Sequence, residues 1–340
     1  MYTSRIMGKA QSIRMRCSGL GLAAAGLLLC GLAQSALAQT CTTVVVDAGG
    51  IEFRGIDGSS DTNVFAVGKD GTIYHYDGSG WTDQTADNND PNLEDLRDVH
   101  AVDTSVAFAV GKGGVILEYD GTDWDLGTLD TATDKEFKGV WAASSTEAFA
   151  VGKDGTVYMF DGTDWSDQSG AAGTGNGDDF EDAWGDADDF YGLTKSGTLF
   201  HFDLGTSSWD ASPITTCDID NDLTFKDLWG DDSGDLFLAG KDKRPNPDEA
   251  VVYQYDVSAG TCTEVGSTTA INKFEGISGS IGTGPGGGNE IYAVGKKGNY
   301  LYSDDGGATW TALAVAAPGD EDQKDVWVSG TGKTFIAGKK

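Results

Sequence analysis

Lysines recur along the chain at one repeated position. Each follows a short apolar stretch that ends in Gly or Thr, as in FAVGK at Phe149 to Lys153. If every copy folds alike, the positive charges converge and attract an anionic group or an acidic partner surface. The alternative is that each lysine offsets nearby acidic residues in exposed pairs, which contribute about 0–1 kcal/mol each. The seven candidate binding residues are Lys69, Lys112, Lys153, Lys195, Lys241, Lys296 and Lys339.

Three aspartates at alternate positions have a spacing that could hold calcium. They are Asp218, Asp220 and Asp222 in the stretch DIDNDL. Hard oxygen ligands at every second residue can point inward together. The pattern then departs from a calcium loop, because Leu223 stands where the turn glycine belongs and Trp229 where the bidentate Glu belongs. The alternative is a solvated acidic loop, and no other cofactor is expected.

Seven copies of one short phrase organise these residues. The phrase reads FKGVW in the third copy, and consecutive copies stand 41 to 49 residues apart. A repeat in the forties with short apolar alternations is typical of β-propeller blades, and the chain after its leader shows no helical period. The copies begin at Phe53, Leu96, Phe137, Phe180, Phe225, Phe274 and Gln323.

Each copy contains the strands of one blade. In the third copy the phrase is the innermost strand, followed by EAFAVG, by TVYMFDG and by the residues around Trp165. Such a sheet must stack on its neighbours to bury both faces. The chain ends at Lys340 after only the second strand of the last copy, and Thr42 to Asp47 match a fourth strand. We predict an all-β, seven-bladed β-propeller whose last blade is closed by N- and C-terminal strands.

The first 38 residues have the features of a signal peptide. A basic stretch precedes an apolar run from Leu20 to Leu32, which is too short for a stable membrane span, and Ala36-Leu37-Ala38 supplies the small residues that signal peptidase requires. We predict a signal peptide over 1–38 and a single propeller domain over 39–340. The domain would have no transmembrane anchor and would be periplasmic or extracellular.

Acidic residues dominate the chain that remains. The whole sequence has 23 Lys and Arg against 54 Asp and Glu, a net charge of −31. The leader holds four of the basic residues and no acidic one, so the remainder carries −35. Such a surface repels nucleic acid and anionic lipid. We expect a monomer whose partner is a protein or a glycan in the cell envelope or the medium.

Three cysteines follow the leader: Cys41, Cys217 and Cys262. An exported protein can hold a disulfide, and an odd count leaves one thiol over. Cys217 and Cys262 fall in consecutive repeats, whereas Cys41 lies near a terminus, so we favour the Cys217–Cys262 pair. The chain has no CxxC motif and no Cys/His cluster, which argues against zinc.

One stretch of the sixth copy, SDDGGATW, resembles the Asp-box, or BNR repeat, of sialidases and other Asp-box propellers. The matching residues are Ser303, Asp305, Gly307, Thr309 and Trp310. The resemblance implies a structural turn on the face away from an active site. The rhythm of W, AVG, G and W over the repeats is also similar to the exported seven-bladed propellers of the Ycf48/HCF136 type. That resemblance implies an assembly factor without catalysis.

Two functions of different classes follow. The first is an exported, non-enzymatic scaffold or assembly factor that binds a protein partner through one face of the ring, with Lys241 to Ala250 as a contacting insertion. The second is an Asp-box glycoside hydrolase or a glycan-binding propeller. A sialidase needs three converging arginines, and after the leader the chain has only Arg54, Arg97 and Arg244. The first two occupy a position that is basic in most repeats, which favours the binding function.

Overall fold

The computed structural model describes most of the chain after its leader. The described residues are 51–85, 94–174, 179–215, 217, 222–231, 233–245, 247–284, 287–314 and 322–339. Within them, no helix is both long enough and apolar enough to cross a membrane.

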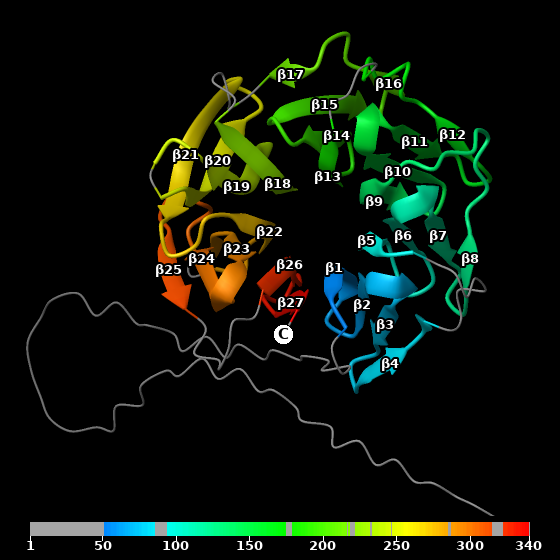
Figure 1. Cartoon of the computed structure of the whole chain (residues 1–340), viewed down its shortest axis with the longest axis horizontal. Helices are drawn as coiled ribbons and strands as arrows, with labels where there is room; N and C mark the ends of the chain where they lie inside the picture. Colours follow the sequence, from blue (N-terminus) through cyan, green and yellow to red (C-terminus); the bar gives the residue numbers. More distant parts are fainter. Residues whose placement is uncertain are drawn as a thin grey trace, which may run out of the picture.

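Six antiparallel sheets of four or five strands form the blades of a ring (Figure 1). Blade one has β1 (Phe53–Ser60), β2 (Asn63–Gly68), β3 (Ile73–Tyr76) and β4 (Trp81–Asp83). Blade two has β5 (Leu96–Ala101), β6 (Ala107–Gly111), β7 (Ile116–Tyr119) and β8 (Trp124–Leu126). Blade three has β9 (Phe137–Ser144), β10 (Glu147–Gly152), β11 (Val157–Phe160) and β12 (Trp165–Asp167).

The remaining blades follow the same order along the chain. Blade four has β13 (Phe180–Gly185), β14 (Asp189–Thr194), β15 (Thr198–Asp203), β16 (Ser208–Trp209) and β17 (Ile214–Thr215). Blade five has β18 (Leu223–Gly230), β19 (Asp235–Asp242), β20 (Glu249–Asp256) and β21 (Thr261–Thr268). Blade six has β22 (Phe274–Ser280), β23 (Glu290–Gly295), β24 (Asn299–Ser303) and β25 (Thr311–Ala314).

A two-stranded sheet completes the ring between blade six and blade one. It consists of β26 (Asp322–Val328) and β27 (Thr334–Lys339), and β26 packs against both β22 and β1. The prediction of seven blades, the last one closed by strands from both termini, is therefore wrong. The described residues form six blades and one two-stranded sheet. The last repeat contributes two strands among the described residues, and Thr42 to Asp47 lie outside these residues.

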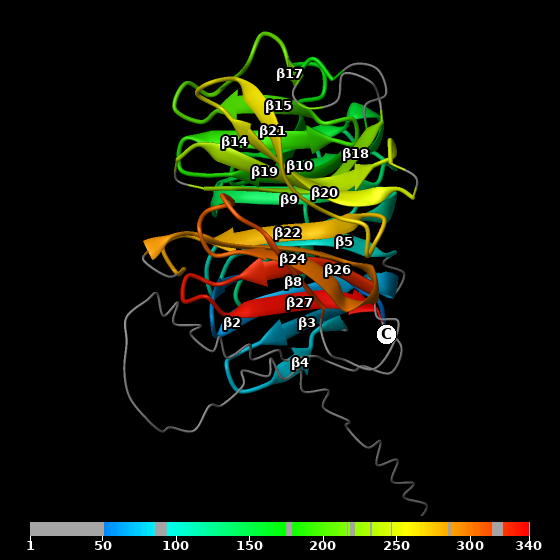
Figure 2. The ribbon, with the colours of Figure 1, turned by 90° about the vertical axis from the view of Figure 1, so that its left-hand side faces the viewer.

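The first strand of every sheet lies closest to the axis of the ring (Figure 1), and the side view shows the sheets stacked face to face (Figure 2). Buried aromatic side chains fill the space between neighbouring blades. Phe65 of β2, for example, packs against Tyr119 and Trp124 of blade two. Single-turn 3₁₀ helices link second and third strands in four sheets, at Lys69–Gly71, Lys112–Gly114, Lys153–Gly155 and Lys296–Gly298.

Candidate functional site

A β-bulge interrupts every first strand at its second repeat position. In β9, Phe137 pairs with Gly152 and Gly139 pairs with Val151, so Lys138 between them has no cross-strand partner. The same register shift occurs in all seven sheets. A bulge re-aims a side chain that strict alternation would place between two sheets. The bulged residues are Arg54, Arg97, Lys138, Glu181, Lys226, Glu275 and Lys324.

These seven bulged residues all line one axial cavity of about 450 Å³. Five are cationic and two are acidic. Glu52, Glu136 and Lys153 line the same cavity beside them. We call this opening the charged mouth and define it by the seven bulged residues. Rigid first strands thus hold charges of both signs around the axis.

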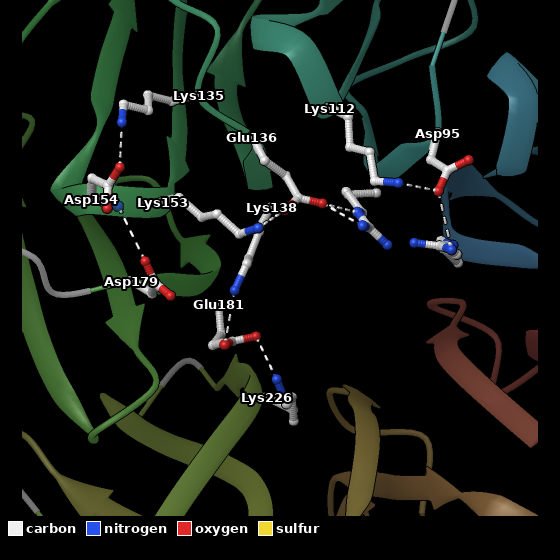
Figure 3. Close-up of polar contacts among 12 residues, drawn as sticks. Asp95, Lys112, Lys135, Glu136, Lys138, Lys153, Asp154, Asp179, Glu181 and Lys226 are labelled. Carbon is white, nitrogen blue, oxygen red and sulfur yellow. Dashed lines mark hydrogen bonds and ion pairs between the residues drawn. The ribbon is translucent and has the colours of Figure 1, made fainter.

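Ion pairs link the bulged residues of neighbouring blades. Lys138 Nζ lies 2.9 Å from Glu181 Oε1, and Lys226 Nζ lies 2.7 Å from Glu181 Oε2. Figure 3 shows both lysines converging on Glu181 from the two sides. Glu275 is approached by Lys324 at 3.8 Å. Lys273 Nζ also lies 2.7 Å from Glu275, so each acidic bulge is shared between two cations.

Arg54 and Arg97 extend this network on the side of blades one and two. The guanidinium of Arg54 lies 3.2 Å from Asp95 and 3.5 Å from Glu52, and Arg97 pairs with Glu136. Burial alone would raise the pKa of Glu52, but Lys69 and Arg54 outweigh it and lower that pKa. Among the described residues the buried Nε of Arg54 has no hydrogen-bond acceptor. The mouth therefore keeps one unused guanidinium donor.

Four aspartates lie deeper along the axis, each one residue after a bulge. They are Asp98, Asp182, Asp227 and Asp325, and each accepts a backbone N–H from the next first strand. Asp325 Oδ2, for example, accepts from Ile56 N at 2.8 Å. Burial, and then repulsion from neighbouring aspartates, raises the pKa of Asp98 well above its usual value, and burial raises the pKa of Asp325 to about 8. We call these four residues the aspartate waist.

Asp182 and Asp227 of the aspartate waist are close neighbours at the axis. Burial raises the pKa of each carboxyl group, and the nearby Asp182 raises that of Asp227 further. Both also accept backbone N–H groups, from Leu228 to Asp182 at 3.1 Å and from Ile277 to Asp227 at 2.6 Å. The waist therefore joins consecutive blades through carboxyl groups at the axis.

Of the seven lysines singled out in the sequence, only Lys153 lines the cavity, and Lys241 and Lys339 lie within strands β19 and β27. Lys69 lies 2.9 Å from Glu52, Lys112 lies 2.8 Å from Asp95, and Lys153 pairs with Glu136. Lys241 pairs with Asp248, Lys296 lies 3.8 Å from Asp322, and Lys339 lies 3.7 Å from Glu52. Among the described residues, Lys195 makes no ion pair. The lysines thus behave mainly as partners of adjacent acids.

The Asp-box-like stretch closes a tight turn after β24. Ser303 Oγ accepts from Gly307 N at 2.8 Å, and Asp305 Oδ1 accepts from Ser303 Oγ at 2.9 Å. Thr309 donates to both oxygens of Asp305, and Trp310 Nε1 donates to Gly307 O at 3.0 Å. All five motif residues take part in these hydrogen bonds, so their role here is structural.

Cys217 and Cys262 form a disulfide with a Cα–Cα distance of 5.4 Å, which links the chain after β17 to β21. Cys41 lies outside the described residues. So do Asp218 and Asp220 of the calcium-like loop, whereas Asp222 lies directly before β18. Within the described part of the chain, no group of three His, Cys, Asp or Glu residues could hold a metal ion.

The three arginines do not meet in one place. Arg54 and Arg97 line the charged mouth, whereas Arg244 pairs with Asp242 and donates to Tyr253 Oη at 3.0 Å. The mouth therefore lacks the three-arginine arrangement that a sialidase needs. The sequence shows the repeated basic position but does not show that it faces the axis. The sequence feature that could have revealed the charged mouth is the charge of the second residue in each opening phrase.

Comparisons with known proteins agree with this geometry at the level of the fold. No family model matches the chain, and no curated protein does either. Among solved structures, it is similar to Ycf48 bound to D1 peptide, with a TM-score of 0.62 and 16% identity over 85% of this chain and 91% of that one. The chain is a β-propeller.

Two further structures are similar to this propeller. Ycf48 from Cyanidioschyzon merolae has a TM-score of 0.59 and 15% identity, covering 85% of this chain and 93% of that one. The WD40 β-propeller domain of Doa1 has a TM-score of 0.62 and 12% identity, covering 85% and 90%. The resemblance to Ycf48 propellers in architecture is thus confirmed, and at these identities it concerns the fold alone.

Proposed function

We propose that this chain is an exported, non-enzymatic propeller that binds a protein partner at its charged mouth. The observation that carries the proposal is the bulge in every first strand. It directs seven repeat-equivalent side chains to one opening, and five of the seven are cationic in a chain of net charge −31. Localised cations on an acidic molecule favour one orientation of an approaching partner.

The fixed pattern of both signs favours a protein segment as ligand. Charges of both signs lie around the mouth, where four neighbouring cations are followed by Glu181, Lys226 and Glu275. Electrostatic complementarity of this kind gives specificity and orientation. Ycf48, a propeller of similar fold, has been solved bound to D1 peptide. That likeness supports a peptide or protein partner for this chain.

The proposal is tested by using the protein and matched variants to capture a partner from the cell envelope or the culture fluid. The mouth variant carries Arg97→Gln, Lys138→Gln, Lys226→Gln and Lys324→Gln. The control is Lys333→Gln, because Lys333 pairs with Asp61 at the opposite end of the first strands. We expect the wild type and the control to retain the same partner and the mouth variant to lose it at least about tenfold.

A variant that removes an acidic residue of the charged mouth, in place of the cations, makes the test more specific. Glu181→Gln removes the acid that neutralises Lys138 and Lys226. If the partner presents acidic groups, this change should increase its capture, whereas the four-site variant decreases it. Equal yields from all four proteins, with thermal unfolding curves showing that each is folded, would exclude the charged mouth as the binding surface.

A further inference from the structure

The opposite end of the axial channel has a different chemistry. The fifth residue of every opening phrase lines a second cavity of about 260 Å³, which the aspartate waist separates from the charged mouth. We call this ring the tryptophan mouth. Its members are Asp57, His100, Trp141, Trp184, Trp229, Ser278 and Trp327. Five of the seven are aromatic, namely four tryptophans and one histidine.

The indoles of this ring are held in place on one side. Trp184 stacks on Tyr191 with ring centroids 6.5 Å apart, and Trp327 lies 5.5 Å from Phe335. The partner rings belong to second strands, which lie outside the first strands, and the indoles themselves line the cavity. Trp184 and Trp327 remain half-buried, whereas Trp141 and Trp229 are 5% and 9% exposed. Aromatic surface is therefore available from the channel.

Glycines in the next first strand lock the indoles further. A Cβ at Gly230 would lie 2.5 Å from the Trp184 ring, and one at Gly58 would lie 3.0 Å from the Trp327 ring. The rings thus occupy space that only glycine leaves open, and they have little freedom to rotate. A preorganised aromatic wall loses little entropy when it binds a ligand.

The ring contains one acidic side chain. Asp57 lies in the ring between Trp327 and His100, and its Oδ2 accepts from Ala101 N at 2.8 Å. The four aspartates of the waist line the inner end of the same cavity. Aromatic faces together with carboxyl groups are the surroundings that recognise an alkylated ammonium, through cation–π attraction and charge. Among the described residues, no Lys or Arg side chain lines this cavity.

We propose that the tryptophan mouth binds an organic cation with an alkylated ammonium head group, held between the indoles and Asp57. The cavity of about 260 Å³ has room for such a head group. This proposal does not depend on the protein-binding role of the charged mouth, because the two cavities use different side chains apart from the shared waist.

The test titrates the purified chain with choline and with its uncharged isostere 3,3-dimethyl-1-butanol, following the indole N–H signals by NMR. The two probes have the same shape, so the difference between them isolates the charge. We expect saturable binding of choline and binding of the isostere at least about tenfold weaker. Signals of Trp184 and Trp327 should move, whereas the signal of Trp81 in β4 should not.

Variants locate the site. Trp327→Leu and Asp57→Asn should each weaken choline binding about three- to tenfold. Trp81→Leu, the same change in a half-buried tryptophan of an outermost strand, should leave it unchanged. Trp327→Phe keeps an aromatic ring and should cost less than Trp327→Leu, which keeps the test informative if the leucine variant folds poorly.

A third probe, a short peptide that contains trimethyllysine, distinguishes an ammonium group on a partner's side chain from one on a free solute. Tighter binding of the peptide assigns the site to a partner's side chain, and tighter binding of choline assigns it to a free solute. Either result supports an ammonium site. Equal affinities for choline and its isostere, or equal losses in Trp81→Leu and Trp327→Leu, would overturn the proposal.

Discussion

At the scale of single residues, two histidines in equivalent positions have opposite surroundings. His75 of β3 and His201 of β15 each pair across to the second strand of their blade. His75 Nε2 lies 2.8 Å from Asn63 Oδ1, and burial lowers the pKa of His75. His201 contacts Asp189 at 2.7 Å and Asp210 at 3.0 Å. Burial alone would lower the pKa of His201, but these two aspartates outweigh it and raise that pKa.

This difference predicts a local pH dependence of stability. Because the pKa of His201 is higher in the folded state, its contribution is fully present below the ordinary histidine pKa and is lost as pH rises through the raised value. His201→Gln should lower the free energy of unfolding by about 2 kcal/mol at pH 5 and by less at pH 8. Urea unfolding at both pH values measures this. If His75→Gln shows the same trend, the two aspartates are not the cause.

The disulfide is a second feature at this scale that contributes to the stability of the fold. Cys217 and Cys262 close a loop with a sequence separation of 45 residues between blades four and five. A cross-link of that span restricts the unfolded chain and is worth about 4 kcal/mol. Replacing both cysteines by serine should lower the denaturation midpoint accordingly. The same midpoint with and without a reducing agent in the wild type would show that the bond is not formed.

At the scale of elements, close approach of first strands explains the glycines beside the bulges. A Cβ on Gly276 would lie 2.7 Å from Asp325 Cα, a backbone atom that cannot move aside cheaply. Gly276→Ala should therefore cost about 1–3 kcal/mol through overpacking. Gly170→Ala is the control, since nothing lies within 4 Å of a Cβ there. Chemical denaturation of both variants measures the difference, and equal costs would contradict tight packing at the axis.

The sequence predicted the strands well because the repeated phrase marks each inner strand. β1, β9 and β22 begin at the residues Phe53, Phe137 and Phe274 that open their copies. The number of blades was predicted wrongly, because the seventh repeat has only two strands among the described residues. The charged mouth escaped prediction for a geometric reason. Strict alternation along a strand would place the second residue of each opening phrase between two blades. The β-bulge instead turns its side chain toward the axis.

At the scale of the whole molecule, the aspartate waist ties ring stability to pH. Burial raises the pKa of Asp325 to about 8, so the folded state keeps a proton that the unfolded chain releases above about pH 4. Stability should therefore fall as pH rises across that interval. Asp325→Asn should reduce the decline in melting temperature between pH 5 and pH 8. Asp70→Asn, in an exposed turn, should leave the decline unchanged, and an unchanged decline in Asp325→Asn would contradict this role.

The ring as a whole separates two kinds of opening. First strands begin at the charged mouth, pass the aspartate waist and end at the tryptophan mouth, so one channel has a polar entrance and an aromatic entrance. A partner that binds at the charged mouth leaves the other entrance accessible. The two proposed ligands can therefore be measured independently on the same molecule.

The central claim is that the partner contacts the charged mouth. It is tested most directly by a photoreactive amino acid placed either at position 138, inside the mouth, or at position 333, at the opposite end. After capture and irradiation, we expect the partner to become cross-linked from position 138 and not from position 333. Cross-links from position 333 alone would contradict the account.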